Sequence, residues 1–269
     1  MIYRPGHPAG TVQPLATRPQ RIVSTVPSQT ELLVDLGLGD ALVGITAYCV
    51  RPKGLLKQKT IIGGTKDLQI DKIRSLAPDL ILGNHEENVK EQIETLKNEF
   101  PVWISDVRSV SDALQMIRQL GILTHTRERA ENIFQNIRNE RDTLQKTQGL
   151  KVAYFIWKDP YMLAGPDTFI GQMLEECGLQ NVAPTGKGRY PQLSLGELEA
   201  LEPDLILLSS EPYPFTTADA HFIAGQILHP LVKIVDGELF SWYGSRMKPA
   251  FRYFSHFCKD LFLSFYENI

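Results

Sequence analysis

The pentapeptide Pro-Asp-Leu-Ile-Leu occurs twice in this chain, at residues 78–82 and at residues 203–207. Each copy follows a short segment whose apolar residues have helical spacing, namely Ile70, Ile73 and Leu76 before the first copy and Leu195, Leu198 and Leu201 before the second. The proline ends each helix, and the apolar run after it is typical of a buried strand. We therefore expect the same helix–turn–strand unit at two places, and a fold built from two related halves.

The segments around the two copies also correspond. Before the first copy, residues 22–26 read as a strand, and Ser28 with Glu31 predicts a capping box that opens a helix ending at Gly37. Before the second copy, residues 152–157 read as a strand and residues 168–177 as a helix closed by Gly178. A later strand is expected at 102–105 in the first half and at 239–242 in the second. This β-α-β order predicts an α/β fold with mainly parallel sheets covered by helices.

Between the halves, residues 125–147 carry an apolar stripe at helical spacing, made by Ala130, Ile133, Phe134, Ile137 and Leu144. The stripe predicts one helix of about six turns, roughly 33 Å long at 1.5 Å per residue. Bending a continuous helix breaks backbone hydrogen bonds, so such a helix would join two lobes stiffly. The expected division is an N-terminal extension over 1–20, a first lobe over 21–122, a linking helix over 123–148 and a second lobe over 149–269. An ordinary surface helix is the alternative interpretation of the stripe.

Composition narrows the class of protein and its partners. The net charge of −3 provides no basic excess for a phosphate backbone, so we expect no nucleic-acid partner. No stretch approaches the roughly 20 consecutive apolar residues that cross a bilayer, so we expect no membrane-embedded segment. Residues 1–20 lack the apolar region of a signal peptide. We expect a cytoplasmic protein if the sequence is complete, and a periplasmic or extracellular one if a signal peptide was trimmed.

Three motifs indicate a known family. They are Arg-Ile-Val-Ser-x-x-Pro-Ser-x-Thr-Glu-Leu at 21–32, Val-Gly-x-x-x-Tyr at 43–48, and Leu-x-Pro-Asp-Leu-Ile in both halves. The sequence resembles the helical-backbone (class III) substrate-binding proteins of ABC transporters, and most closely those that bind vitamin B12. The resemblance implies a monomeric binding protein, not an enzyme, with a ligand cleft between two lobes. The implied ligand is a cobalamin or other corrinoid, a ferric siderophore or haem, with no permanently bound cofactor, and the implied partner is an ABC permease.

Position by position, the resemblance implies a set of ligand-binding residues, namely Tyr48, Thr65, Lys66, Trp157, Tyr190, Trp242, Tyr243 and Arg246. Aromatic rings suit the face of a corrin or porphyrin, because they bury a large area at little entropic cost. Arg246 would pair with a ligand carboxylate or amide oxygen. Thr65 stands where the family has a tryptophan. The loop cations Arg51, Lys66, Lys158 and Arg189 keep an anionic siderophore open as the ligand.

The resemblance also implies permease-docking carboxylates and a disulfide. Asp71 and Glu197 are the positions expected to meet arginines of a permease, although the second match is Gly196, with Glu197 beside it. Alternatively, both carboxylates favour the N-terminal ends of their helices through the macrodipole. Cys177 and Cys258 fall where vitamin B12-binding members of the family have a disulfide, whereas free buried thiols are the alternative for all three cysteines, Cys49 included.

Other functions stay open. A receptor for a bare metal ion would use His85 and Glu86 with His221 or His229, because zinc needs three or four such ligands. An enzyme is not indicated by any hydrolase, metalloprotease or nucleotide-binding motif in the sequence. A cytoplasmic corrinoid-binding or metal-binding protein that is not coupled to transport is a third alternative.

Overall fold

The computed structural model describes residues 13–228 and 230–266, which divide into two α/β units. The first unit contains residues 13–107, 111–138 and 242–247, and the second contains residues 108–110, 139–228, 230–241 and 248–266. The short segment Trp242–Met247 therefore groups with the first unit, whereas the sequence-based division placed it in the second lobe.

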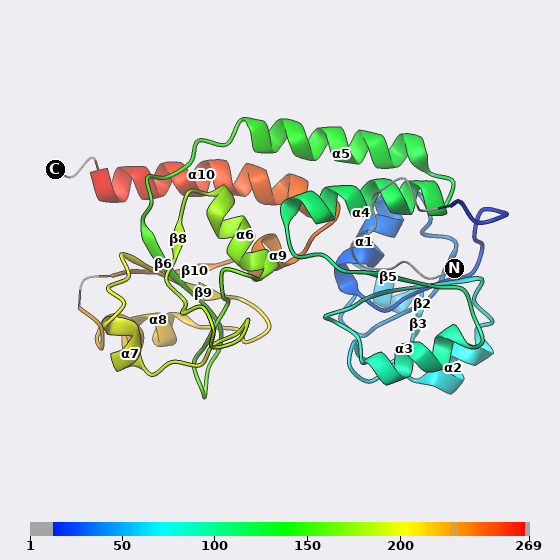
Figure 1. The fold of residues 1–269 in the computed structure, drawn as a ribbon, viewed down its shortest axis with the longest axis horizontal. Helices are drawn as coiled ribbons and strands as arrows, with labels where there is room; N and C mark the ends of the chain where they lie inside the picture. The colour runs from blue at the N-terminus through cyan, green and yellow to red at the C-terminus, as the bar shows by residue number, and fades with distance from the viewer. Residues whose placement is uncertain (1–12, 229, 267–269) are drawn as a thin grey trace. The chain divides into compact units, whose positions relative to one another are not determined.

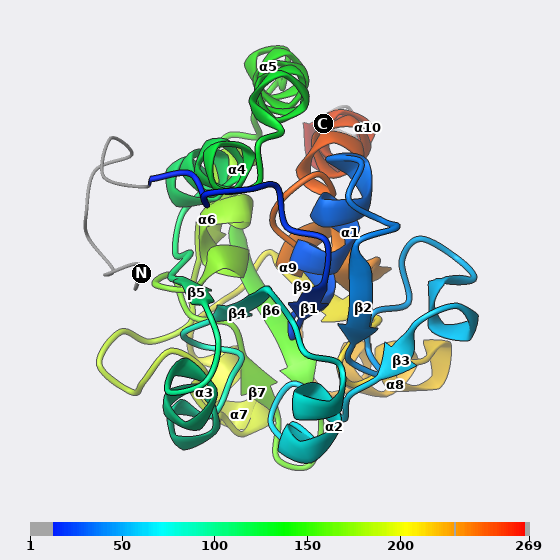
Figure 2. The ribbon, with the colours of Figure 1, turned by 90° about the vertical axis from the view of Figure 1, so that its right-hand side faces the viewer.

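The first unit is built on a five-stranded parallel sheet in the order β3-β2-β1-β4-β5. Its strands are β1 (Ile22–Ser24), β2 (Leu42–Ile45), β3 (Thr60–Ile61), β4 (Leu80–Asn84) and β5 (Val102–Ser105). Its helices are α1 (Pro27–Asp35), the 3₁₀ turn η2 (Leu55–Lys57), α2 (Ile70–Ser75), α3 (Lys90–Lys97) and α4 (Val110–Leu123). Helices α1 and α4 lie on one side of the sheet and α2 and α3 on the other (Figures 1 and 2).

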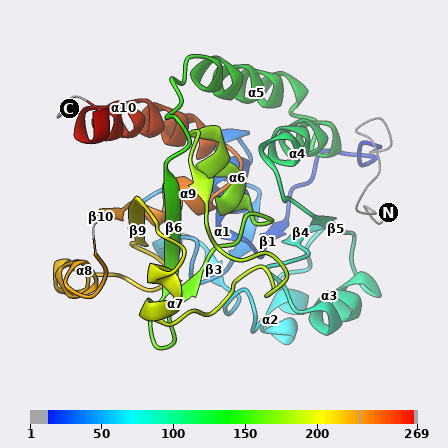
Figure 3. The same ribbon diagram turned by 60° about the vertical axis from the view of Figure 1, so that its left-hand side comes forward.

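The second unit has a sheet of mixed direction in the order β10-β9-β6-β7, with β8 also paired to β6. Its strands are β6 (Lys151–Trp157), β7 (Met162–Leu163), β8 (Gln180–Asn181), β9 (Leu205–Ser209) and β10 (Leu231–Val235), of which only β7 is antiparallel to its neighbour. Its helices are α6 (Phe169–Glu176), α7 (Leu195–Glu199), α8 (Thr217–Ala224), α9 (Gly237–Ser241) and α10 (Met247–Tyr266). Figure 3 shows α6 and α9 on one side of β6 and α7 on the other.

The repeated pentapeptide has the same structural role in both units. The residue before its proline, Ala77 in one copy and Glu202 in the other, has a positive φ that turns the chain directly from helix into strand. The aspartate carboxylate then accepts a hydrogen bond from a backbone N–H at the start of the neighbouring strand. Asp79 Oδ1 accepts from Arg21 at 3.0 Å, and Asp204 Oδ2 accepts from Lys151 at 2.8 Å. The helix–turn–strand prediction is therefore confirmed in both halves, as is the α/β class with mainly parallel sheets.

The two units are connected by α5 (Arg127–Asp142), because the division between them falls inside this helix. The helix buries Ala130, Phe134 and Ile137, as the apolar stripe predicts. It is shorter than the expected 125–147, and its 16 residues span about 24 Å. The C-terminal end is early because Thr147, which was assigned to the helix, instead hydrogen-bonds through its Oγ1 and N–H to the carbonyl of Cys177.

Two local predictions are wrong. The capping box of Ser28 and Glu31 does not form, since α1 has Val26 as its N-cap without a side-chain bond, and Pro27 begins the helix. Residues 239–242 are not a strand, because most of this run belongs to α9. Asp236 Oδ1 accepts the N–H of Glu238 at 3.0 Å, which favours a helix start here. The last strand is instead β10, at 231–235.

Candidate functional site

The strand orders indicate where each unit binds a ligand. In the first sheet, the chain builds outward from β1 through β2 to β3 and then reverses to β4 and β5, so the order switches between β1 and β4. In the second sheet it switches between β6 and β9, because β7 and β8 pair with one side of β6 and β9 with the other. Ligands of open α/β sheets bind outside the carboxyl ends of the strands at such switch points.

In the first unit the switch point is occupied by a buried polar network. Thr25 Oγ1, directly after β1, donates to Asn88 Oδ1 at 2.8 Å, and the same oxygen accepts the N–H of Asn84 at 2.9 Å. Gln29 Nε2 donates to Ser105 Oγ at 2.6 Å, and Asn84 Nδ2 donates to that hydroxyl at 3.0 Å. Buried polar groups are stable only when paired, so these bonds fix the loops after β1, β4 and β5 rigidly.

The network extends to three of the expected ligand-binding residues. Asn88 Nδ2 donates to the carbonyl of Thr65 at 3.0 Å, and Lys66 Nζ donates to the carbonyl of Glu86. Tyr48 follows β2 and is 62% exposed, and a Cβ placed on Gly64 would lie 3.2 Å from its ring. The structure therefore brings Tyr48, Thr65 and Lys66 together around one loop, with the tyrosine ring presented to solvent.

In the second unit the switch point carries an aromatic row. Trp157 ends β6 and is 41% exposed, and its ring contacts Tyr213, which follows β9, at a centroid distance of 5.8 Å in an edge arrangement. Tyr213 continues to the buried Phe215 at 4.8 Å, and Phe215 to Phe155 at 6.2 Å. The exposed indole is thus backed by rings that anchor it to the core.

An ion pair lies at the same edge. Lys158 Nζ is 2.6 Å from Asp219 Oδ1, and the Asp219 side chain is only 10% exposed. Asp219 also accepts from the N–H and the hydroxyl of Thr216, which begins α8. The hydrogen bond from Lys158, and those from Thr216, lower the pKa of Asp219 to about 2. Asp219 therefore stays ionised at neutral pH and ties the residue after Trp157 to the start of α8.

Tyr190 is half-exposed on a segment that pairs with the chain near β7. Leu163 donates its N–H to the carbonyl of Pro191 at 3.0 Å, and Gly165 donates to the carbonyl of Arg189 at 2.8 Å.

Two residues at the carboxyl edge of the second sheet, Tyr213 and Asp219, were not predicted from the sequence. The signal for Tyr213 was available in Glu-Pro-Tyr-Pro-Phe, directly after the second Pro-Asp-Leu-Ile-Leu strand.

The expected residues near the end of the chain lie in a different environment. Trp242 and Tyr243 are buried, with 8% and 6% exposure, rather than presented as open rings. Arg246 forms a two-pronged ion pair with Glu31, at 2.9 Å from Nε and 2.5 Å from the terminal nitrogen. The guanidinium carbon of Arg246 is 5.6 Å from the centroid of the Trp242 ring.

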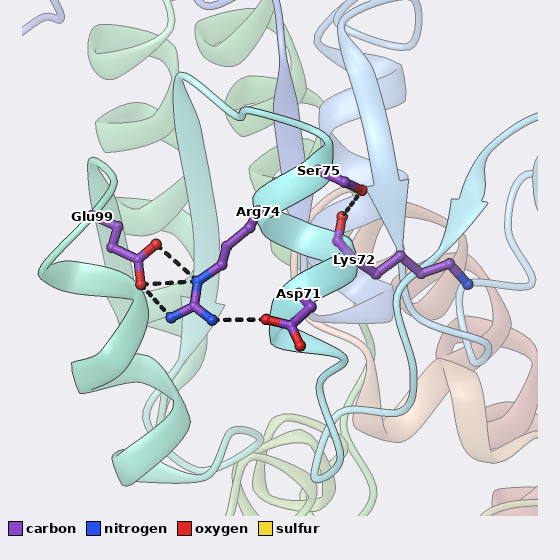
Figure 4. Close-up of polar contacts among 5 residues, drawn as sticks. All are labelled: Asp71, Lys72, Arg74, Ser75 and Glu99. Atoms are coloured by element: carbon purple, nitrogen blue, oxygen red, sulfur yellow. Dashed lines mark hydrogen bonds and ion pairs between the residues drawn. The ribbon is translucent and has the colours of Figure 1, made fainter.

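The two expected docking carboxylates differ in environment. Figure 4 shows Asp71 at the start of α2, with its Oδ1 2.8 Å from the guanidinium of Arg74. The same guanidinium also binds both carboxylate oxygens of Glu99. The Asp71 side chain is nevertheless 95% exposed. Glu197 instead forms a capping box with Ser194 at the start of α7, and those hydrogen bonds lower its pKa. Asp71 is therefore accessible at the surface, while Glu197 serves its own helix.

All three cysteines are buried free thiols, so the disulfide implied by the family resemblance is not formed in this structure. Cys177 and Cys258 are nevertheless neighbours, since Cys258 Sγ donates to the carbonyl of Cys177 at 3.7 Å. Burial raises the pKa of Cys177 well above the usual thiol value.

The metal-ion hypothesis gains no support from the part of the chain that the structure describes. Within residues 13–228 and 230–266, no three histidine, cysteine or acidic side chains gather as metal ligands. His229, one of the proposed ligands, lies outside the described residues.

A cavity of about 40 Å³ lined by Leu15, Leu80 and Val102 lies at the amino ends of β4 and β5, opposite to the switch-point edge.

Comparison with known proteins agrees with this geometry. The family profile described as periplasmic binding protein matches residues 22–229. The chain belongs to this family. The periplasmic binding protein family resemblance deduced from the motifs is therefore confirmed, and with it the solute-binding class of function. Among the described residues, no helix of this family member is both long and apolar enough to cross a membrane.

Proteins similar to this chain are named for different ligands. The chain is 25% identical over 236 residues to a vitamin B12-binding protein of Pectobacterium carotovorum, covering 85% of this chain and 84% of the relative. It is 27% identical over 244 residues to an ABC transporter substrate-binding lipoprotein of Bacillus subtilis, YvrC, covering 85% and 76%. It has the fold of the periplasmic haem-binding protein RhuT from Roseiflexus, with a TM-score of 0.75, 21% identity and coverage of 90% and 98%.

Proposed function

We propose that this chain binds a metal chelate, either a corrinoid such as cobalamin or an iron chelate such as haem or a ferric siderophore, and delivers it to an ABC importer. The observation that carries the proposal is the exposure of one large ring at the carboxyl edge of each sheet, Tyr48 in the first unit and Trp157 in the second. The Tyr48 loop is held by a hydrogen bond from the Ala47 N–H to the Gly63 carbonyl at 2.9 Å, and the Trp157 ring is held by its contact with Tyr213. Membership of the periplasmic binding protein family supports the transport role.

Rigid rings are suited to a flat macrocycle. A ring that is already anchored loses little side-chain entropy on binding, so most of the area it buries contributes to affinity. Trp157 is backed by Tyr213, and Tyr48 lies against Gly64. We propose that these two rings, with Tyr190 as a third, contact the ligand face.

Cations at the same edges would contact the polar periphery of the ligand. Lys66 is exposed on the loop beside Tyr48, and the partly exposed Arg189 directly precedes Tyr190. Both cations donate to backbone carbonyls, Lys66 to Glu86 and Arg189 to Asp167, which positions them on their loops. Carboxylate or amide groups on a chelate are the chemistry that such donors recognise.

Equilibrium titration tests the ligand class. Purified protein should be titrated calorimetrically with cobalamin, haemin and a ferric hydroxamate siderophore, each beside its metal-free form where one exists. We expect one of the three to bind with a dissociation constant in the micromolar range or below, which corresponds to about −8 kcal/mol. Dissociation constants weaker than about 1 mM for all three would refute the proposal.

Docking to a permease is proposed through Asp71, because its side chain is 95% exposed, compared with 53% for Glu197. Exposed charges govern association more than they govern stability. Asp71→Asn should therefore reduce uptake of the labelled chelate by cells that carry the matching permease, while calorimetric affinity for the chelate stays unchanged. Glu94→Gln is the matched control, since Glu94 is another exposed carboxylate of the first unit with a lysine neighbour. Equal uptake by the Asp71 and Glu94 variants would contradict docking through Asp71.

A further inference from the structure

The segment Trp242–Met247 connects two helices of the second unit but packs with the first. Helix α9 ends at Ser241, and residues 248–266 of α10 belong to the second unit. The chain therefore passes from the second unit to the first and returns within six residues. The chain also changes unit around residues 108–110 and within α5.

A partly buried ion pair holds the segment on α1. Glu31 and Arg246 are 215 residues apart in sequence, and both oxygens of Glu31 bind the guanidinium. Their side chains are 16% and 13% exposed, compared with 45% and 43% for the Glu131–Arg118 pair of the same unit. Exposed pairs contribute little to stability, whereas removing one partner of a desolvated pair leaves a costly unpaired charge.

The backbone of the segment also approaches α1 closely. Gly244 has a φ of +89°, a conformation that side-chain-bearing residues rarely adopt. A Cβ at this position would lie 3.4 Å from the carbonyl oxygen of Ser28 and from Leu32 Cβ. Met247 then donates its N–H to the carbonyl of Gly244 at 3.1 Å, which closes the turn.

Tyr243 inserts its ring toward the polar network of the first unit. Burial raises the pKa of its hydroxyl, and the nearby polar side chains of Ser28, Ser105 and Gln29 offset part of that effect. Ser105 and Gln29 are the residues that fix the loops at the switch point. The segment therefore contacts the groups that shape the candidate site without itself presenting exposed rings.

We propose that Glu31 is a positioning residue, which through Arg246 latches the segment Trp242–Met247 onto α1 and so holds Tyr243 beside the polar network of the first unit. Without the latch, the segment would lose a bidentate, partly buried ion pair and would be held less firmly on α1. This inference does not depend on the identity of the ligand, because it rests only on contacts within the protein.

Hydrogen exchange measured by mass spectrometry tests the latch directly. In Glu31→Leu, we expect the rate of amide exchange to rise about tenfold in the peptide that covers residues 242–247. This peptide includes the hydrogen-bonded amide of Met247. Glu131→Leu is the matched control, because it removes the exposed partner of Arg118, and it should change exchange in that peptide less than twofold. The double variant Glu31→Arg with Arg246→Glu restores the pair with reversed charges and should return exchange to the wild-type value.

Thermal unfolding by calorimetry supplies an independent reading. Glu31→Leu should lower the unfolding temperature, because it leaves the partly buried Arg246 without this carboxylate. Glu131→Leu should lower it less, and the charge-reversed variant should return it toward the wild-type value. Unchanged exchange at 242–247, an equal rise of exchange throughout residues 22–105, or failure of the charge reversal to restore protection would overturn the proposal.

Discussion

Replacing Trp157 by alanine perturbs the exposed ring most directly. A tryptophan side chain buries up to about 250 Å² on full burial, and Trp157 is 41% exposed, so a ligand can cover about 100 Å² of it. At about 25 cal/mol per Å², this area corresponds to about 2.5 kcal/mol, or a roughly 70-fold increase in dissociation constant. A ligand that covers only half of the exposed ring would give an increase of roughly eightfold.

Isothermal titration with the chelate that binds the wild type measures this effect without relying on indole fluorescence. Phe222→Ala is the matched control, because Phe222 is a 54% exposed ring of the second unit on α8 and is not a proposed ligand-binding residue. We expect a roughly 10-fold to 70-fold loss of affinity for Trp157→Ala and less than a twofold change for Phe222→Ala. A dissociation constant unchanged by Trp157→Ala, or raised equally by both substitutions, would refute the assignment of this ring.

Two further predictions concern stability. The pKa of Asp219 is lowered to about 2, so its ion pair should stabilise the fold above pH 4 and lose that effect as the pH falls toward 2. Urea unfolding should therefore show a difference between wild type and Asp219→Asn that is larger at pH 7 than at pH 3, and an equal difference would contradict the ion pair. A mild oxidant should join Cys177 to Cys258, seen as the loss of two hydrogen atoms in the intact mass. Because the residues are 81 positions apart, the bond should raise the free energy of unfolding by about 4 kcal/mol, and absence of the cross-link in peptide maps would show that the thiols are not close.

The repeated elements could be predicted because their signals are local. The apolar spacing before each Pro-Asp-Leu-Ile-Leu and the proline itself fix a helix, a turn and a strand without reference to distant residues. The strand at 102–105 and the helix over 168–177 were predictable for the same reason, and both agree with the structure, in which α6 runs from Phe169 to Glu176. The sequence therefore contained the framework of both sheets.

The wrong predictions involve competing or distant partners. The run Leu239–Trp242 is too short for apolar periodicity to separate helix from strand, and Asp236 decides it by capping α9. Glu31 was assigned to a capping box, but Arg246 binds it from 215 residues away, which no local pattern reveals. The exposed rings at 48 and 157 were found by resemblance. The position of Tyr213 after the second repeat strand can be seen in the sequence, but its contact with Trp157 depends on the spatial adjacency of β6 and β9.

The central claim is that one metal chelate is the ligand of this chain. Native mass spectrometry of the protein mixed separately with equimolar cobalamin, haemin and a ferric siderophore tests it most directly. We expect, with at least one of them, a single added species whose mass equals one intact chelate with its metal. Spectra that contain only the unliganded protein, or a statistical ladder of several adducts with every chelate, would contradict the claim.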